Sequence, residues 1–192
     1  MSDQIRWVPG NQLPAGIWWR LLAVVAGAGV VSLGAQTTTP SLNEIPGTLQ
    51  PLAVLLVGMG LGPLYGTLGV GLYVLLGVLG APVFANGTAG FGGPTSGYFI
   101  GFILAALIAG LISERACAQA TARATTRLIV AALIGIFMIY AGGLIWLMVN
   151  VGLSFTDALA VGFTPFIIVD LLEAAVAAAV VAILASTLRP TS

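Results

Sequence analysis

Lysine and histidine are absent from this chain of 192 residues, and cysteine occurs once, as Cys117. Without lysine, no phosphate-binding loop ending in Gly-Lys-Ser or Gly-Lys-Thr exists, which excludes ATP hydrolysis by that route. Without histidine and with one cysteine, the usual zinc and iron sites and a Ser-His or Cys-His catalytic pair are excluded. We therefore expect a protein that is not an enzyme and that has no metal site or cofactor.

Charge is also scarce. Only 6% of the residues are charged and 59% are hydrophobic, whereas a soluble domain carries about 25% charged residues. The net charge is zero, and no basic stripe indicates a nucleic-acid partner. The composition predicts a single integral membrane domain over residues 1–192, with the lipid bilayer around it.

The apolar runs predict an all-α, six-transmembrane-helix bundle, because a helix needs about 20 apolar residues to cross a bilayer. The spans are expected at about residues 17–35, 49–61, 64–79, 94–112, 128–149 and 165–188. Pro63 separates the second span from the third, since proline lacks an N–H and disfavours helix just before itself. The second span is short, so we expect neighbouring helices to bury it. A short helix is expected from Thr156.

All six arginines fall on one side of the membrane in this arrangement. They are Arg6, Arg20, Arg115, Arg123, Arg127 and Arg189. Cytoplasmic connections collect lysine and arginine, so both termini are expected in the cytoplasm, with Glu44, Asn86 and Asn150 outside. A cleaved signal peptide is the alternative for the N-terminus, but the segment before the first apolar run is long for one and contains Pro9 and Pro14.

Small residues recur at every fourth position of three predicted helical segments. The three ridges are Gly58, Gly62 and Gly66; Gly97, Gly101, Ala105 and Ala109; and Ala174, Ala178 and Ala182. Such ridges let helix backbones approach closely in lipid, which favours internal packing. A docking surface for another membrane protein, also including Ala23 and Gly27, is the alternative.

Asp170 and Glu173 are the acidic residues inside the predicted spans. Each costs about 2.5–3.5 kcal/mol at the centre of a membrane helix, so their presence favours a functional site over a purely structural pair. They are three residues apart and share a helix face. Repulsion between such close carboxyl groups favours a proton on one of them.

Other polar side chains are predicted at a similar depth near the outer side. They are Thr48, Gln50, Asn86, Thr95, Ser96 and Tyr98. The amides offer paired donors and acceptors that suit an amide or ureido group. Together with Asp170 they predict an outward-facing polar pocket, for which Phe84, Phe91, Trp146 and Tyr73 are the expected apolar walls.

Six segments carry a family resemblance. They are Ile-Pro-Gly-Thr-Leu-Gln at 45–50, Leu-Ala-Val-Leu-Leu-Val-Gly at 52–58, Leu-Gly-Pro at 61–63, Leu-Tyr-Val-Leu-Leu-Gly-Val-Leu-Gly-Ala-Pro-Val-Phe-Ala at 72–85, Gly-Pro-Thr-Ser-Gly-Tyr-Phe-Ile-Gly-Phe at 93–102, and Pro165-Phe166 followed by Asp170. The sequence resembles the BioY family, the biotin-specific substrate-binding (S) components of energy-coupling factor (ECF) transporters. The resemblance covers most of residues 20–185 in order and spacing.

The resemblance implies a bundle in a prokaryotic plasma (inner) membrane whose pocket opens outward to biotin or a biotin analogue. It also implies partners, namely an ECF coupling protein and two ATPases, although some family members act alone. The family positions that hold the bicyclic ring of biotin match Asn86 and Asp170. The predicted binding residues are thus Asn86, Asp170, Glu173, Gln50, Thr48, Tyr98 and Thr95.

One position departs from the family. A lysine that grips the carboxylate of biotin is common three residues after the aspartate, and this chain has Glu173 there. Two interpretations of the ligand are therefore open. Either free biotin binds weakly through a protonated Glu173, or the ligand is a different compound that is neutral or cationic. A membrane scaffold that kept the fold and lost transport is a further alternative.

Cysteine labelling tests the predicted topology. In a background without Cys117, we expect Asn150→Cys in intact cells to react with a membrane-impermeant maleimide, and Gln119→Cys to react only after the membrane is opened. Labelling of position 119 from outside would contradict the six-span arrangement.

Overall fold

A computed structural model describes residues 16–39, 47–119 and 124–187, and in these ranges the chain is helical apart from two short strands and the connections. In chain order, the elements are α1 (Ile17–Gln36), β1 (Thr38–Thr39), β2 (Gly47–Thr48), α2 (Gln50–Val78), η1 (Ala85–Gly87), α3 (Ser96–Gln119), α4 (Ala124–Val149), α5 (Phe155–Gly162) and α6 (Ile167–Thr187). The strands pair antiparallel, with Thr38 opposite Thr48. The predicted all-α class is confirmed.

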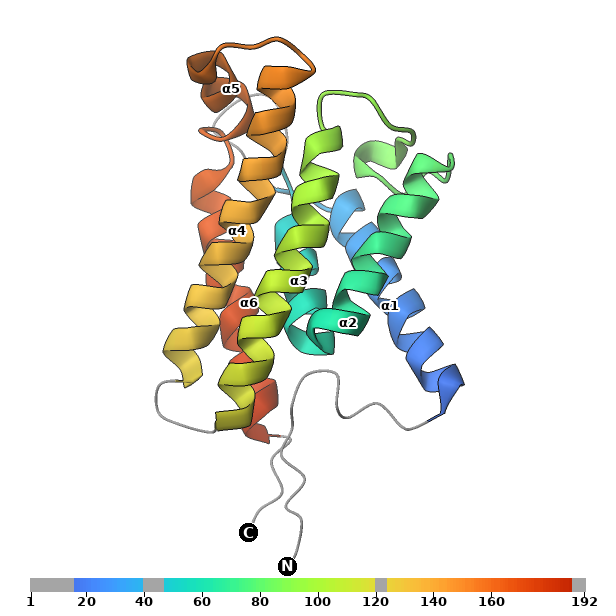
Figure 1. The fold of residues 1–192 in the computed structure, drawn as a ribbon, viewed down its shortest axis with the longest axis vertical. Helices are drawn as coiled ribbons and strands as arrows, with labels where there is room; N and C mark the ends of the chain where they lie inside the picture. The colour runs from blue at the N-terminus through green and yellow to red at the C-terminus, as the bar shows by residue number, and fades with distance from the viewer. Residues whose placement is uncertain (1–15, 40–46, 120–123, 188–192) are drawn as a thin grey trace, which may run out of the picture.

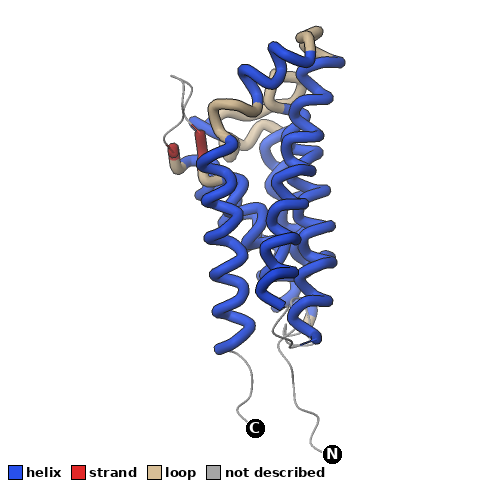
Figure 2. The backbone as a smooth tube through the Cα atoms, turned by 90° about the vertical axis from the view of Figure 1, so that its left-hand side faces the viewer, coloured by secondary structure: helices blue, strands red, loops and turns tan. Residues whose placement is uncertain are grey.

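The long helices lie side by side along one axis (Figures 1 and 2). α2, α3, α4 and α6 form a closed ring of neighbours, and α1 packs against α2 at the edge. We call the end that carries η1 and α5 the upper end. At the lower end α1 begins, α3 and α6 finish, and α4 begins (Figure 1).

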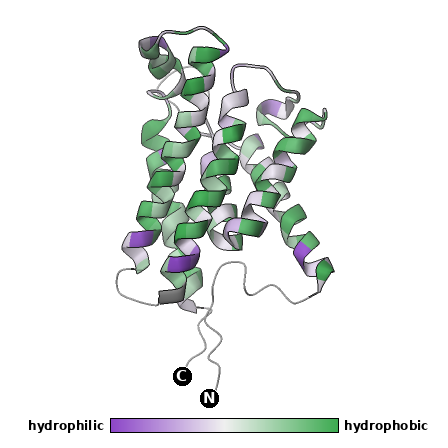
Figure 3. Cartoon of the chain, viewed as in Figure 1, coloured by the Kyte–Doolittle hydropathy of each residue, from purple (hydrophilic) through white to green (hydrophobic). Residues whose placement is uncertain are grey.

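Five helices in the described ranges, namely α1, α2, α3, α4 and α6, are long and apolar enough to cross a membrane. Hydrophilic colour appears near the lower ends of α1, α3 and α4, whereas apolar residues cover the middle of the bundle (Figure 3). Arg20, Arg115 and Arg127 belong to these lower segments. The chain is therefore a multi-pass membrane protein with its described arginines at one end.

The α2 helix breaks at the predicted position. Gly62 has φ 79° and ψ 176°, a conformation that suits glycine, and Pro63 follows it. Beyond the break the chain folds back, so that a side chain at Gly66 would meet the backbone of Gly58 at 2.7 Å. Pro63 has no N–H for the carbonyl of Met59, and the buried Ser113 hydroxyl of α3 donates to that oxygen at 3.0 Å instead.

Small residues form the internal contacts of the bundle, in line with the packing interpretation. An added Cβ at Gly101 would lie 2.7 Å from the Ile139 oxygen of α4, and one at Gly58 would lie 2.6 Å from the Ala106 backbone of α3. The alternative interpretation, a docking surface on the first span that includes Gly27, does not hold for this residue. This glycine is buried against α2, where an added Cβ would lie 3.1 Å from the Val57 side chain and 3.5 Å from the Gly69 backbone.

The predicted connection at residues 113–127 is shorter than expected. α3 continues to Gln119 and α4 already begins at Ala124. The sequence there is rich in alanine, the strongest helix former, so the helices extend beyond their apolar spans. The short helix expected from Thr156 is confirmed as α5, whose start is capped by the Ser154 hydroxyl accepting from the Asp157 N–H at 3.2 Å.

The link between Ser113 and Met59 predicts a stability effect. Ser113→Ala leaves a buried carbonyl without a donor and is expected to lower the free energy of unfolding by about 1–2 kcal/mol. Ser186→Ala is the matched control, because this exposed hydroxyl bonds only within its own helix, and we expect a change below about 0.5 kcal/mol. Denaturant titration in detergent measures both, and equal effects would remove the special role of Ser113.

Candidate functional site

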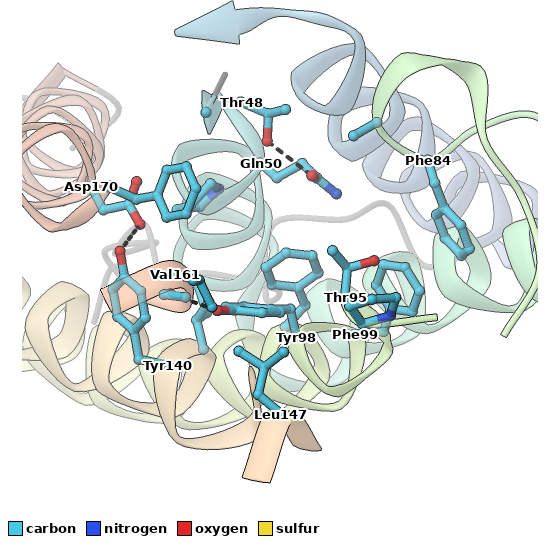
Figure 4. A pocket seen from close by; sticks show the side chains of 18 of the residues that line it. Thr48, Gln50, Phe84, Thr95, Tyr98, Phe99, Tyr140, Leu147, Val161 and Asp170 are labelled. Carbon is cyan, nitrogen blue, oxygen red and sulfur yellow. Dashed lines mark hydrogen bonds between the residues drawn. The ribbon is translucent and has the colours of Figure 1, made fainter. Parts of the chain in front are cut away.

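A cavity of about 340 Å³ opens in the upper half of the bundle, between α2, α3, α4, α5 and α6 (Figure 4). Its lining residues are Gly47, Thr48, Gln50, Pro51, Phe84, Ala85, Thr88, Pro94, Thr95, Tyr98, Phe99, Phe102, Ile139, Tyr140, Leu147, Val161, Gly162, Phe166 and Asp170. Aromatic and aliphatic walls with a few convergent polar groups are typical of a small-molecule site.

Asp170 provides the acidic group of the cavity. Its carboxylate accepts a hydrogen bond of 2.5 Å from the Tyr140 hydroxyl of α4, and the residue is only 7% exposed. Tyr140 occupies one carboxylate oxygen, and a carboxylate can accept several bonds. Asp170 can therefore accept N–H or O–H groups from a ligand.

Gln50 lines the cavity at the start of α2 and is held by two side-chain hydrogen bonds. Its side-chain amide donates to the Tyr73 hydroxyl at 2.7 Å, and its oxygen accepts from Thr48 at 2.9 Å. Tyr73 is fully buried in the second half of α2. Because the break at Gly62 folds that half against the first, the tyrosine lies where it can fix the Gln50 side chain.

Phe84 and Phe99 form a stacked wall, with ring centroids 4.1 Å apart and planes at 24°. The Phe84 ring lies against Gly77, where any Cβ would collide with it. The Phe84 carbonyl accepts from the Gln36 amide of α1 at 2.7 Å, which holds the start of η1 in place. Figure 4 shows this aromatic wall on the side of the cavity away from Asp170.

Tyr98 closes another side of the cavity. Its hydroxyl donates to the Gly162 carbonyl of α5 at 2.6 Å. A Cβ at Gly162 would lie 2.6 Å from this hydroxyl, so the glycine is what allows α5 to approach α3. The bond links the end of α5 to the first turn of α3.

The structure brings together five of the predicted binding residues, because Thr48, Gln50, Thr95, Tyr98 and Asp170 all line the cavity. Ser96, which was also proposed as a polar group, is buried and accepts from the Gly92 N–H at 2.9 Å. Of the four residues proposed as apolar walls, Phe84 lines the cavity and the other three do not. Tyr73 lies behind Gln50, and Phe91 packs edge-on against Trp146.

Asn86 does not line the cavity in this structure. It is exposed in η1, between the lining residues Ala85 and Thr88, and has a left-handed φ of 57°. Asparagine adopts this conformation more readily than most residues. The backbone thus explains an asparagine here, and its role in binding stays a prediction.

Glu173 lies outside the cavity lining as well, although it shares a helix with Asp170. One carboxylate oxygen accepts from the Leu52 N–H in the first turn of α2 at 2.9 Å. The other oxygen is buried with no hydrogen-bond partner among the described residues. A carboxylate at a helix N-terminus is favoured by the helix dipole, so Glu173 anchors the start of α2.

Sequence reasoning missed Tyr140, the partner of Asp170. A polar aromatic residue in the middle of the apolar span 128–149 was an available signal, because a buried tyrosine hydroxyl usually has a hydrogen-bond partner. Phe99 and Ile139 were also missed, and their apolar side chains carry no signal that separates a cavity wall from ordinary packing.

Comparison with known proteins identifies the family. The sequence profile of the BioY family matches residues 11–190. The chain belongs to the BioY family. A probable biotin transporter BioY of Pyrococcus horikoshii is 39% identical over 151 residues, covering 77% of this chain and 85% of the relative. The biotin transporter BioY of Thermotoga maritima is 39% identical over 169 residues, covering 86% and 90%.

The fold agrees with this membership. A crystal structure of the S-component for biotin from an ECF-type ABC transporter superposes with a TM-score of 0.75 at 24% identity, covering 87% of this chain and 90% of that one. The S-component fold expected from the resemblance is therefore confirmed for this BioY protein, and the family is one of transporters, not enzymes.

Glu173 gives a prediction about stability. Glu173→Leu leaves the Leu52 N–H without its acceptor, and we expect the free energy of unfolding to fall by about 1–3 kcal/mol. Glu173→Gln keeps an acceptor at the same place and is expected to lose less than about 1 kcal/mol. Denaturant titration compares the two variants, and a leucine variant as stable as the glutamine variant would show that the bond does not hold α2.

Proposed function

We propose that the chain is the substrate-binding component of a vitamin uptake transporter, which captures biotin or a biotin-like ring compound from the outer side of a prokaryotic plasma membrane. The carrying observation is the cavity with Asp170 at one side and the stacked Phe84 and Phe99 at the other, in a member of the BioY family. Relatives along most of the chain carry the name biotin transporter.

The bicyclic ring of biotin fits the chemistry of this cavity. Its ureido group offers two N–H donors, which the free acceptor positions of the Asp170 carboxylate can receive. Thr48, Gln50, Thr95 and Tyr98 supply the further polar contacts. In this proposal Asn86 contributes from η1, and Glu173 acts through the start of α2, which carries Gln50.

The proposed topology has six passes within a single membrane domain. α2 supplies two of them, because the chain folds back at Gly62, and α1, α3, α4 and α6 supply the others. The upper end faces outward and the lower end, with Arg20, Arg115 and Arg127, faces the cytoplasm together with both termini. This places the cavity on the outer side.

Transport then depends on a partner module. The chain has no lysine for a phosphate-binding loop, so it hydrolyses no ATP by that route. An ECF coupling protein and two ATPases are the partners that we propose for this S component.

Titration calorimetry on the purified chain tests the function, with biotin and biotinamide as ligands. We expect saturable binding, and we expect Asp170→Asn to weaken it roughly five- to 150-fold, since losing one buried polar contact costs about 1–3 kcal/mol. Asn86→Ala is expected to weaken binding in the same direction. Asp157→Asn is the control, because Asp157 is exposed in α5 and outside the cavity lining.

The outcome that contradicts the proposal is the absence of saturable heat with either ligand. Binding that is unchanged in both Asp170→Asn and Asn86→Ala would instead move the site away from this cavity.

A further inference from the structure

Building on the proposed function, we infer that this cavity selects ligands whose tail carries no negative charge, such as biotin amides and esters, over free biotin. The charges around the cavity carry this inference. Asp170 is the one acidic side chain among the lining residues, and none of these residues is a lysine, an arginine or a histidine. An anionic tail in this cavity would therefore meet an acid and no cation.

Among the described residues, no cation lies near the cavity either. The sequence contains no lysine or histidine, and the described connections at the upper end contain no arginine. These connections are residues 37–39, 47–49, 79–95 and 150–166. Among the described residues, the arginines are Arg20, Arg115 and Arg127, all in the lower segments of their helices.

A helix N-terminus is the other common site for a carboxylate, because its N–H groups are free and its dipole end is positive. At α2, which begins beside the cavity, this position is already taken. Pro51 has no N–H, the Leu52 N–H donates to Glu173, and the Ala53 N–H donates to the Leu49 carbonyl at 3.0 Å. The chain's own carboxylate thus occupies the N–H donor of Leu52 at the N-terminus of α2.

Glu173 is therefore a positioning residue that also sets specificity. It is not itself a lining residue of the cavity, but it adds a second acid one turn from Asp170 and accepts from the N–H donor of Leu52. An ionised carboxyl tail loses its hydration in the cavity and gains no opposite charge in return. A neutral amide tail gives up less hydration and meets no repulsion.

The test compares two ligands that share the ring and differ in tail charge, biotin and biotinamide, by titration calorimetry at neutral pH. We expect wild type to bind biotinamide about tenfold more tightly than biotin. Glu173→Gln keeps an acceptor for Leu52 and removes the charge, so this preference should fall about two- to fivefold. Asp157→Asn removes one negative charge away from the cavity and should keep the wild-type preference.

A second variant keeps the test independent of Glu173. Thr88 is exposed and lines the cavity, and its carbonyl accepts from the N–H of Phe84. The side chain of Phe84 lies on the side of the cavity away from Asp170 (Figure 4). Thr88→Lys places a cation at the cavity, and Thr88→Gln is a control with a long side chain that carries no charge. The preference for biotinamide should be about two- to fivefold lower in Thr88→Lys than in Thr88→Gln.

The outcomes separate the two proposals. Free biotin bound as tightly as biotinamide by wild type would overturn the inference and leave the proposed function standing. Binding of neither ligand would overturn the proposed function, and this inference with it.

Discussion

The break of α2 at Gly62 and Pro63 is the constraint on which the rest of the structure depends. In lipid every backbone polar group needs a partner inside the protein, so a broken helix survives only where neighbours satisfy its free carbonyls. Ser113 does this for Met59. The fold-back then presses Gly66 on Gly58 and places both halves of α2 where the cavity needs them.

Each half of α2 serves the cavity in a different way. The first half begins with Gln50 and Pro51 in the lining, and the second half carries Tyr73, which fixes the Gln50 amide, and Gly77, which makes room for the Phe84 ring. A straight helix of the same length would carry Tyr73 about 35 Å from Gln50 at 1.5 Å per residue. The kink is thus what builds a polar site from residues 23 positions apart in the chain.

The electrostatics of the site follow from how its acids are paired. Asp170 is bonded to Tyr140, faces the cavity and keeps acceptor capacity, whereas Glu173 is used to hold the start of α2. Unpaired charges cost free energy in a membrane interior. Each of the two acids accepts a hydrogen bond from a donor on another helix. The lining residues include no positive group, and the preference for an uncharged ligand tail that we infer rests on this.

Sequence alone determined most of the helical segments, the break at Pro63 and the common end of Arg20, Arg115 and Arg127. Membrane crossings need long apolar runs, and proline removes a backbone donor. The sequence also pointed to Thr48, Gln50, Thr95, Tyr98 and Asp170, since polar groups at one depth in apolar helices tend to converge. Tertiary structure decided the rest. Glu173 lies about 60° around α6 from Asp170, and only the packing of α2 against that face turns it to Leu52 instead of the cavity.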